Sequence, residues 1–425
     1  MMSTPINRAR LRQNLLLTMI LLITMSGILL DHARAAPPAT TATNASKPLL
    51  LQAARVFDGV DLHDNYAVLI RAGKVASIGP STQLRRKGAK TIDLGDATIL
   101  PGFIELHGHV AYQNVPRDVV LRHGVTTVRD VGGPLLPLSG GNGQLRLLTA
   151  GPIITGPGGY PSPVFTGDVS AAVATPEAAR ILVQNLVAGG ANIIKIGLEP
   201  GGETGAPWTT GHVPSTEPPW PMPTPEVVQA VVDEAHGLGK EVTAHVGEAQ
   251  GLQMAVDAGV DEIAHVPCDT IPEAPRDLLR EAVVKGIRFL STVDTFSHCQ
   301  GTHENLHRLV HLGAKIHYAA EIAHTEIPWG IDAEELHRLL HVNMAVDSTD
   351  VFGIILKLFR SATSEAGKVL ALGPEGGLDK LGTLTPGAPA DIIAVPGNAF
   401  QAFKPLEYPD LVISGGKVIV NRFTR

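Results

Sequence analysis

The strongest constraint on the fold of this 425-residue chain is an alternation of short apolar or β-branched runs with stretches of helical periodicity. The runs occur at 98–106, 125–128, 152–155, 192–196, 241–244, 262–264, 287–292 and 314–318. Most are separated by a helical stretch, such as the one at 225–238. Eight strands with intervening helices predict an α/β fold of the (β/α)8 TIM barrel type. In such barrels the chemistry lies at the carboxyl ends of the strands, so the residues that end each run are the first to consider.

The two ends of the chain have a different pattern, in which short β runs are joined by turns that contain Gly and Asp. We predict strands at 50–56, 67–71 and 74–78, and again at 390–395 and 411–420. Two β-rich ends around a different middle predict a small β-sandwich made from both. Its expected parts are 49–99 and 379–425, with the hydrolase-type barrel inserted as 100–378.

The first residues predict export. Three arginines precede an uncharged apolar run at 15–30, and the small residues up to Ala35 and Ala36 fit a signal-peptidase site. We therefore expect 1–35 to be a signal peptide cleaved near Ala35 or Ala36, and 36–48, rich in Pro, Ala and Thr, to be a disordered lead-in. The mature chain would be periplasmic or secreted, without a membrane attachment after the signal is removed.

Composition limits the partners. A formal net charge of −7, with no basic cluster beyond the first residues, argues against a nucleic-acid partner. The expected partner is a small-molecule or short-peptide substrate, and the sequence leaves a homo-oligomer open. Cys268 and Cys299 are the only two cysteines. Whether they form a disulfide stays open, because distance cannot be inferred from sequence.

Potential metal ligands occur at the ends of several predicted strands. They are His107 and His109 on the first, Lys195 within the fourth, His245 after the fifth, His265 after the sixth and Glu321 beyond the eighth. Residues i and i+2 of a strand point to the same side, so both imidazoles of the first pair face one way. Imidazole is the commonest side-chain ligand for zinc. Any one of these residues has a structural explanation, but their joint position at strand ends favours a shared metal site.

Eight motifs extend over nearly all of the expected mature chain. They are ARVFDG at 54–59, LPGFIELHGH at 100–109, GVTTVRDVGG at 124–133, IIKI at 193–196, TAHV at 243–246, GVDEIAH at 259–265, GTLTPGAPAD at 382–391 and VISGGK at 412–417. In these motifs the chain resembles the amidohydrolase superfamily, in the group of imidazolonepropionase-like and dipeptidase-like metal-dependent hydrolases.

The resemblance implies a site with two divalent metal ions, zinc being the expected metal. His107 and His109 would bind the more buried ion, and His245 and His265 would hold the second. Lys195, carboxylated by CO2, would bridge both. The implied reaction is attack of a metal-activated hydroxide on an amide, peptide-like or cyclic amide C–N bond, as in a dipeptidase.

The chain departs from the family pattern at two positions. The family ends the eighth strand in Gly-Thr-Asp, whereas this chain has Ala-Ala-Glu ending at Glu321. We expect Glu321 to replace the aspartate as metal ligand and acid/base catalyst, with Glu326 and Asp332 as nearby substitutes. Tyr160 stands where many relatives carry histidine and is expected to contact substrate. Arg129 is either structural or a partner for a substrate carboxylate.

Two alternatives remain open. Glu248 follows His245 by three residues, a spacing found in mononuclear deaminases of the same superfamily, although those enzymes lack a lysine equivalent to Lys195. The second alternative is a non-catalytic ligand-binding protein of this fold, because the end of the eighth strand departs from the family pattern. The long Pro- and Gly-rich segment at 199–225 predicts a lid or a substrate-contacting loop.

Overall fold

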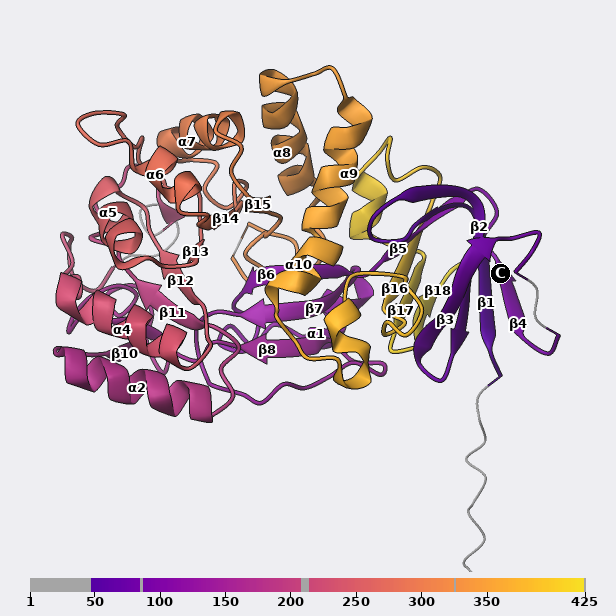
Figure 1. Cartoon of the computed structure of the whole chain (residues 1–425), viewed down its shortest axis with the longest axis horizontal. Coiled ribbons are helices and arrows are strands. Elements are labelled where there is room, and N and C mark those ends of the chain that lie inside the picture. Colours follow the sequence, from indigo (N-terminus) through magenta and orange to yellow (C-terminus); the bar gives the residue numbers. More distant parts are fainter. Residues whose placement is uncertain (1–46, 85–86, 208–213, 325, 424–425) are drawn as a thin grey trace, which may run out of the picture. The chain divides into compact units, whose positions relative to one another are not determined.

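Short parallel strands surrounded by helices form the centre of the computed structural model (Figure 1). The structure describes residues 47–84, 87–207, 214–324 and 326–423. The described residues belong to one compact unit, Ser46–Arg425. The predicted signal peptide and all but the last two residues of the predicted lead-in lie outside the described residues. No helix in the described part of the chain is both long and apolar enough to cross a membrane.

The barrel strands occur in two sheets. They are β6 (Phe103–Gly108), β7 (Val125–Asp130) and β8 (Arg146–Thr149) in one, and β10 (Ser170–Ala172), β9 (Ile153–Thr155), β11 (Ile194–Gly197), β12 (Val242–His245), β13 (Glu262–Ile263), β14 (Arg288–Leu290) and β15 (Ile316–His317) in the other. All of the pairings within these sheets are parallel. The predicted (β/α)8 barrel is therefore confirmed.

Two of the predicted strands are interrupted. The run at 98–106 divides at Gly102 into β5 (Ala97–Pro101), which belongs to the terminal sheet, and β6. A Cβ at Gly102 would overlap the side chain of Thr126, so only glycine fits there. The third barrel strand consists of β8 and β9, with a break at Gly151 and Pro152. Gly151 has a positive φ of 81°, and proline has no N–H to donate to the ladder. The predicted run at 152–155 covers only the β9 half of this strand and misses β8.

The barrel closes between its first and eighth strands through a few specific hydrogen bonds. The buried carboxylate of Glu105 on β6 accepts the His107 N–H at 2.7 Å and the Ala320 N–H at 2.9 Å. The His109 N–H donates to the carbonyl of Ile322 at 2.9 Å. Strand β15 is only two residues long, so its ladder of hydrogen bonds does not extend to the carboxyl end of the barrel. The bonds from Ala320 and His109 take the place of that ladder. They also hold the two ends of the barrel wall where His107, His109 and Glu321 lie.

Amphipathic helices cover the barrel strands. They are α1 (Arg117–Arg122), α2 (Pro176–Ala188), α4 (Pro225–Gly237), α5 (Ala249–Ala258), α6 (Leu278–Val284), α7 (Gln300–His311), α8 (Ala333–Val346), α9 (Val351–Ser361) and α10 (Ser364–Val369), with 3-10 turns η1 (Glu375–Lys380) and η2 (Lys404–Glu407). Helix α2 is typical. The Thr175 hydroxyl caps it by accepting the Ala178 N–H, and Ala179, Val183 and Leu186 form its buried stripe.

The two ends of the chain pair into one sheet, as predicted. Its strands are β18 (Lys417–Asn421), β17 (Leu411–Ser414), β16 (Ile392–Pro396), β5, β1 (Leu49–Phe57), β2 (Leu62–Arg71) and β3 (Lys74–Pro80) in that order, with β4 (Lys90–Asp93) paired to β1. Figure 1 shows these first and last segments of the unit gathered together. The pairing of β5 with β16 joins the two ends of the chain. Strand β5 then continues through Gly102 into β6.

Candidate metal centre and active site

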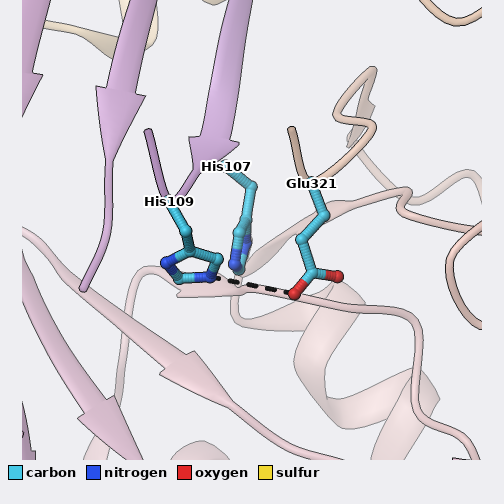
Figure 2. Close-up of side chains that lie close together, drawn as sticks. All are labelled: His107, His109 and Glu321. Carbon is cyan, nitrogen blue, oxygen red and sulfur yellow. Dashed lines mark ion pairs between the residues drawn. The ribbon is translucent and has the colours of Figure 1, made fainter. Parts of the chain in front are cut away.

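Three potential ligands converge at the point where the barrel closes. His107 lies on β6, His109 follows two residues later, and Glu321 follows β15 (Figure 2). One ligand atom from each lies within 4.8 Å of the others. Nε2 of His109 lies 3.8 Å from Oε1 of Glu321. The replacement of the family aspartate by Glu321 therefore still delivers a carboxylate to the histidine pair.

Glu321 reaches this position through an unusual backbone conformation. Its φ is +58°, in the left-handed region that non-glycine residues seldom adopt, and Ala323 has a φ of +98°. Between them, Ile322 forms the bridge to Gly108 that closes the barrel. Such conformations are found most often at functional sites, where the surrounding structure maintains them.

The other three predicted ligands lie beside this group. The His265 ring centroid is 4.4 Å from that of His107 and 4.7 Å from that of His245, and His265 Nδ1 lies 3.8 Å from Glu321 Oε2. Lys195 on β11 is buried, and its charge contributes to lowering the pKa of all four histidines. The structure thus brings all six predicted ligands together.

Burial sets the protonation states of these groups. It lowers the pKa of His109 to about 3 and that of Lys195 to about 7, and it raises the pKa of Glu321 to about 8. The imidazole is therefore neutral, as a metal ligand must be. The imidazole nitrogen of His109 and the carboxyl oxygen of Glu321 thus face a common centre.

The residues present fit a bound cation. Among the described residues, neither ring nitrogen of His107 has a hydrogen-bond partner, and the same holds for Nζ of Lys195 and Oε2 of Glu321. Each of these atoms is buried, and an unsatisfied buried polar group costs about 1–3 kcal/mol. Divalent ions bound to the lone pairs of these imidazole and carboxylate groups would remove that cost.

Sequence reasoning missed one supporting residue. The Thr292 hydroxyl, just beyond β14, lies 3.0 Å from Nδ1 of His265. That contact fixes the ring and leaves Nε2 for an ion, which is the usual task of a group behind a metal-binding histidine. Thr292 also has a positive φ, of 43°. No sequence pattern marked it, because its role depends on the packing of β13 against β14.

A pocket with an aromatic and apolar wall opens onto the centre. His109, His245 and Glu321 line it. The wall is formed by Tyr112, Ile153, Tyr160, Val164, Phe165 and Phe296. The Tyr160 ring stacks on that of His245 at 4.3 Å between centroids. Tyr160 therefore lies where a substrate bound in this pocket would contact it.

Arg129 is not among the residues that line this pocket. Its side chain is fully buried in the barrel, where it donates to the carbonyl of Leu106 at 2.9 Å and to Oε1 of Glu262 at 2.5 Å. Arg288 donates to the other oxygen of Glu262 at 2.7 Å. Burial alone would raise the pKa of Glu262, but the charges of Arg129 and Arg288 outweigh it and lower that pKa to about 2.

The other acids named from the sequence also lie outside the pocket wall. Glu248 accepts the Gly202 N–H at 3.0 Å and lies in a separate group of carboxylates. Glu326 is exposed and faces His298. Asp332 caps α8 by accepting backbone N–H groups. Of the candidate acid/base residues, Glu321 has the position expected of the catalyst.

A family model described as "Amidohydrolase family" matches residues 98–419. That span includes every barrel strand, all six ligands and the C-terminal strands of the terminal sheet up to Ile419.

Individual proteins show the same likeness. Ochratoxinase from Aspergillus niger is 26% identical over 303 residues, which are 67% of this chain and 58% of that protein. The match thus spans somewhat more than half the length of this relative. Among solved structures, a Xaa-Pro dipeptidase with bound methionine has a TM-score of 0.66 at 22% identity, covering 87% of this chain and 99% of the other. A. niger ochratoxinase has a TM-score of 0.64 at 18% identity, covering 88% and 96%. At these identities the structural likeness concerns the fold.

Proposed function

This chain belongs to the amidohydrolase family, and on that premise we propose that it is an exported, metal-dependent hydrolase of amide C–N bonds in N-acyl amino acids or short peptides. The observation that carries the proposal is the convergence of His107, His109 and Glu321 within 4.8 Å, beside an apolar pocket that His109 and Glu321 line.

Two divalent ions, zinc in the first instance, are the proposed cofactors. His107 and His109 would hold one ion together with Glu321, and His245 and His265 the other. A carbamate formed from Lys195 and CO2 would supply the negative bridge that two adjacent cations need, because an ammonium group would repel them. Bound ions would supply the positive charge that acidifies a water molecule and polarises the substrate carbonyl.

Glu321 is the proposed proton carrier. Its carboxylate is held at the carboxyl end of the barrel by the backbone bridge of Ile322. From there it would accept a proton from the water that attacks the carbonyl carbon. It would then donate that proton to the leaving nitrogen as the C–N bond breaks. The side chain is one methylene longer than the family aspartate, and the residue that carries it has a left-handed backbone.

The pocket supports an apolar or aromatic group on the substrate. Tyr160 and Phe296, with Phe165 and Tyr112, provide a wall suited to a hydrophobic side chain beside the scissile bond. The similar structure named as a Xaa-Pro dipeptidase has methionine bound in its active site, which supports short peptides as the substrate class. A cyclic amide is the remaining candidate substrate.

The test is hydrolysis by the zinc-loaded mature protein of a matched library of N-acyl amino acids, dipeptides including Xaa-Pro, and cyclic amides. We expect the highest kcat/KM for substrates with a bulky apolar side chain. Failure to hydrolyse any of them with two zinc ions bound would contradict the proposal. Ammonia release as the sole activity would support the deaminase alternative, which the position of Glu248 outside the pocket wall does not favour. Saturable ligand binding without turnover would support the non-catalytic alternative.

Export is a separate part of the proposal. It rests on the apolar run at 15–30 and the small residues before Ala36. Expression of the full chain in a two-membrane bacterium should place it in the periplasm, with an N-terminus at Ala36 or Pro37 by mass spectrometry. An intact N-terminus on cytoplasmic protein would contradict this part alone.

A further inference from the structure

A second group of carboxylates lies beside the candidate active site and contacts it through Glu199 and His245. Glu199 follows β11, Glu203 lies four residues further along the same loop, and Glu248 directly precedes α5. One oxygen from each lies within 4.8 Å of the others. Glu199 and Glu203 are each only 1% exposed. We call these three residues the glutamate cluster.

Positive side chains of the described residues do not neutralise the glutamate cluster. In the described parts of the chain, no lysine or arginine forms an ion pair with any of the three residues. The only ion-pair partner of Glu199 there is His245, whose Nε2 lies 3.4 Å from Oε2. Burial, together with the neighbouring carboxylates, raises the pKa of Glu199 well above its usual value and that of Glu203 to about 7. Three buried carboxylates therefore ionise together only where positive charge, such as a cation that displaces their protons, compensates them.

Unpartnered oxygens point into this group. Both carboxylate oxygens of Glu203 are buried and accept no hydrogen bond among the described residues, and Oε2 of Glu199 has only the 3.4 Å contact with His245. The remaining oxygens are used differently, since Oε1 of Glu199 accepts the Gly201 N–H at 2.6 Å and Oε1 of Glu248 accepts the Gly202 N–H at 3.0 Å. These two bonds orient the carboxylates and leave three oxygens available on the inside.

The local backbone leaves room for this arrangement. A Cβ at Gly247 would overlap the carboxylates of both Glu203 and Glu199, so only glycine permits their approach. Glu248 does not form a side-chain cap on α5, although it occupies the N-cap position. Its side chain instead turns toward Gly202 and the cluster. Helix capping therefore does not account for Glu248.

We propose that the glutamate cluster binds a divalent cation of the kind that prefers oxygen ligands, such as calcium, at a site distinct from the histidine centre. Calcium accepts carboxylates singly or as bidentate ligands, and Glu203 has both oxygens to offer. The bound ion would tie the loop after β11 to the start of α5. The ammonium group of a substrate is the less suitable occupant, because none of the three glutamates lines the substrate pocket.

Equilibrium dialysis with calcium, magnesium or manganese, followed by elemental analysis, tests the proposal on the zinc-loaded mature protein. We expect one further ion per chain, saturable, in the unaltered protein. Glu203→Gln keeps the shape of the side chain and should weaken binding at least tenfold, and Gly247→Ala should do the same by displacing the carboxylates. Glu217→Gln, at an exposed position on the same loop, is the matched control and should bind normally. Glu199 is left unchanged because of its contact with His245.

Zinc content and hydrolysis are measured in parallel, so that the two proposals fail separately. Unchanged zinc content in Glu203→Gln, with loss of the additional ion, supports the cation site whether or not the protein hydrolyses amides. A rise in the thermal midpoint with calcium, seen in the unaltered protein and absent in Glu203→Gln, supports it independently. The proposal is overturned if none of the three ions binds, or if Glu203→Gln binds them as tightly as the unaltered protein.

Discussion

Replacing Arg129 by methionine should destabilise the barrel severely and leave substrate recognition intact. Arg129 and Glu262 are both fully buried, and removing one partner of a buried pair costs about 3–5 kcal/mol. Because Arg288 would still pair with Glu262, we expect the lower end of that range. Arg129 and Arg288 together outweigh burial and lower the pKa of Glu262 from 4.5 to about 2, a net stabilisation of its ionised form of about 3 kcal/mol to which both arginines contribute.

The pH dependence of stability provides a signature. The folded-state pKa of Glu262 lies below its unfolded value, so this contribution is fully present above about pH 4.5 and is lost as the pH falls toward 2. The stability difference between unaltered protein and Arg129→Met should therefore shrink across that interval. Denaturant midpoints measured at several pH values are the assay. The double variant Arg129→Met with Glu262→Met is the control, and it should recover most of the loss.

Two results would refute this reasoning. One is an Arg129→Met protein with an unchanged denaturant midpoint. The other is a variant that is stable but has a KM raised specifically for substrates that carry a carboxylate, which would assign Arg129 to substrate binding instead of to the barrel interior.

Three further predictions concern the site and its surroundings. Glu321→Gln should lower kcat at least 100-fold at unchanged stability, while Glu321→Asp should retain part of the activity; equal rates for Gln and Glu would remove the proton-transfer role. Thr292→Val, which removes the hydrogen bond to His265, should weaken zinc binding about 10- to 100-fold in a chelator competition, and unchanged affinity would show that the contact is not needed. Cys268 and Cys299 are joined by a disulfide in the structure. Replacing both by serine should lower the free energy of unfolding, measured by denaturant titration, by about 3–4 kcal/mol. An unchanged value would show that the bond does not stabilise the fold.

The ligand set was predictable because barrel topology converts position in a strand into position in space. His107, Lys195, His245 and His265 lie on or next to separate strands, and parallel strands bring their carboxyl ends to one face. Glu321 was predictable in position, since it follows the eighth strand. Its left-handed backbone was not, because nothing in Ala-Ala-Glu-Ile indicates a positive φ.

Features that depend on contacts between distant segments were not predictable from the sequence. The division of the first predicted strand follows from the approach of Thr126 to Gly102. The hydrogen bond from the Ala320 N–H to Glu105 depends on closure between the first and eighth strands. The glutamate cluster was equally hidden, since neither the spacing of Glu248 from His245 nor its place before a helix indicates its approach to Glu199 and Glu203.

The most direct test of the proposed two-metal centre is the zinc content of the mature protein, purified without chelator and compared with a variant in which His107 and His109 are both alanine. Close to two zinc ions per chain, with a clear loss of zinc in the variant, is the predicted result. A single ion would contradict the bridged centre formed with Lys195. No zinc, together with failure to reload it, would contradict the assignment of a metal-dependent hydrolase.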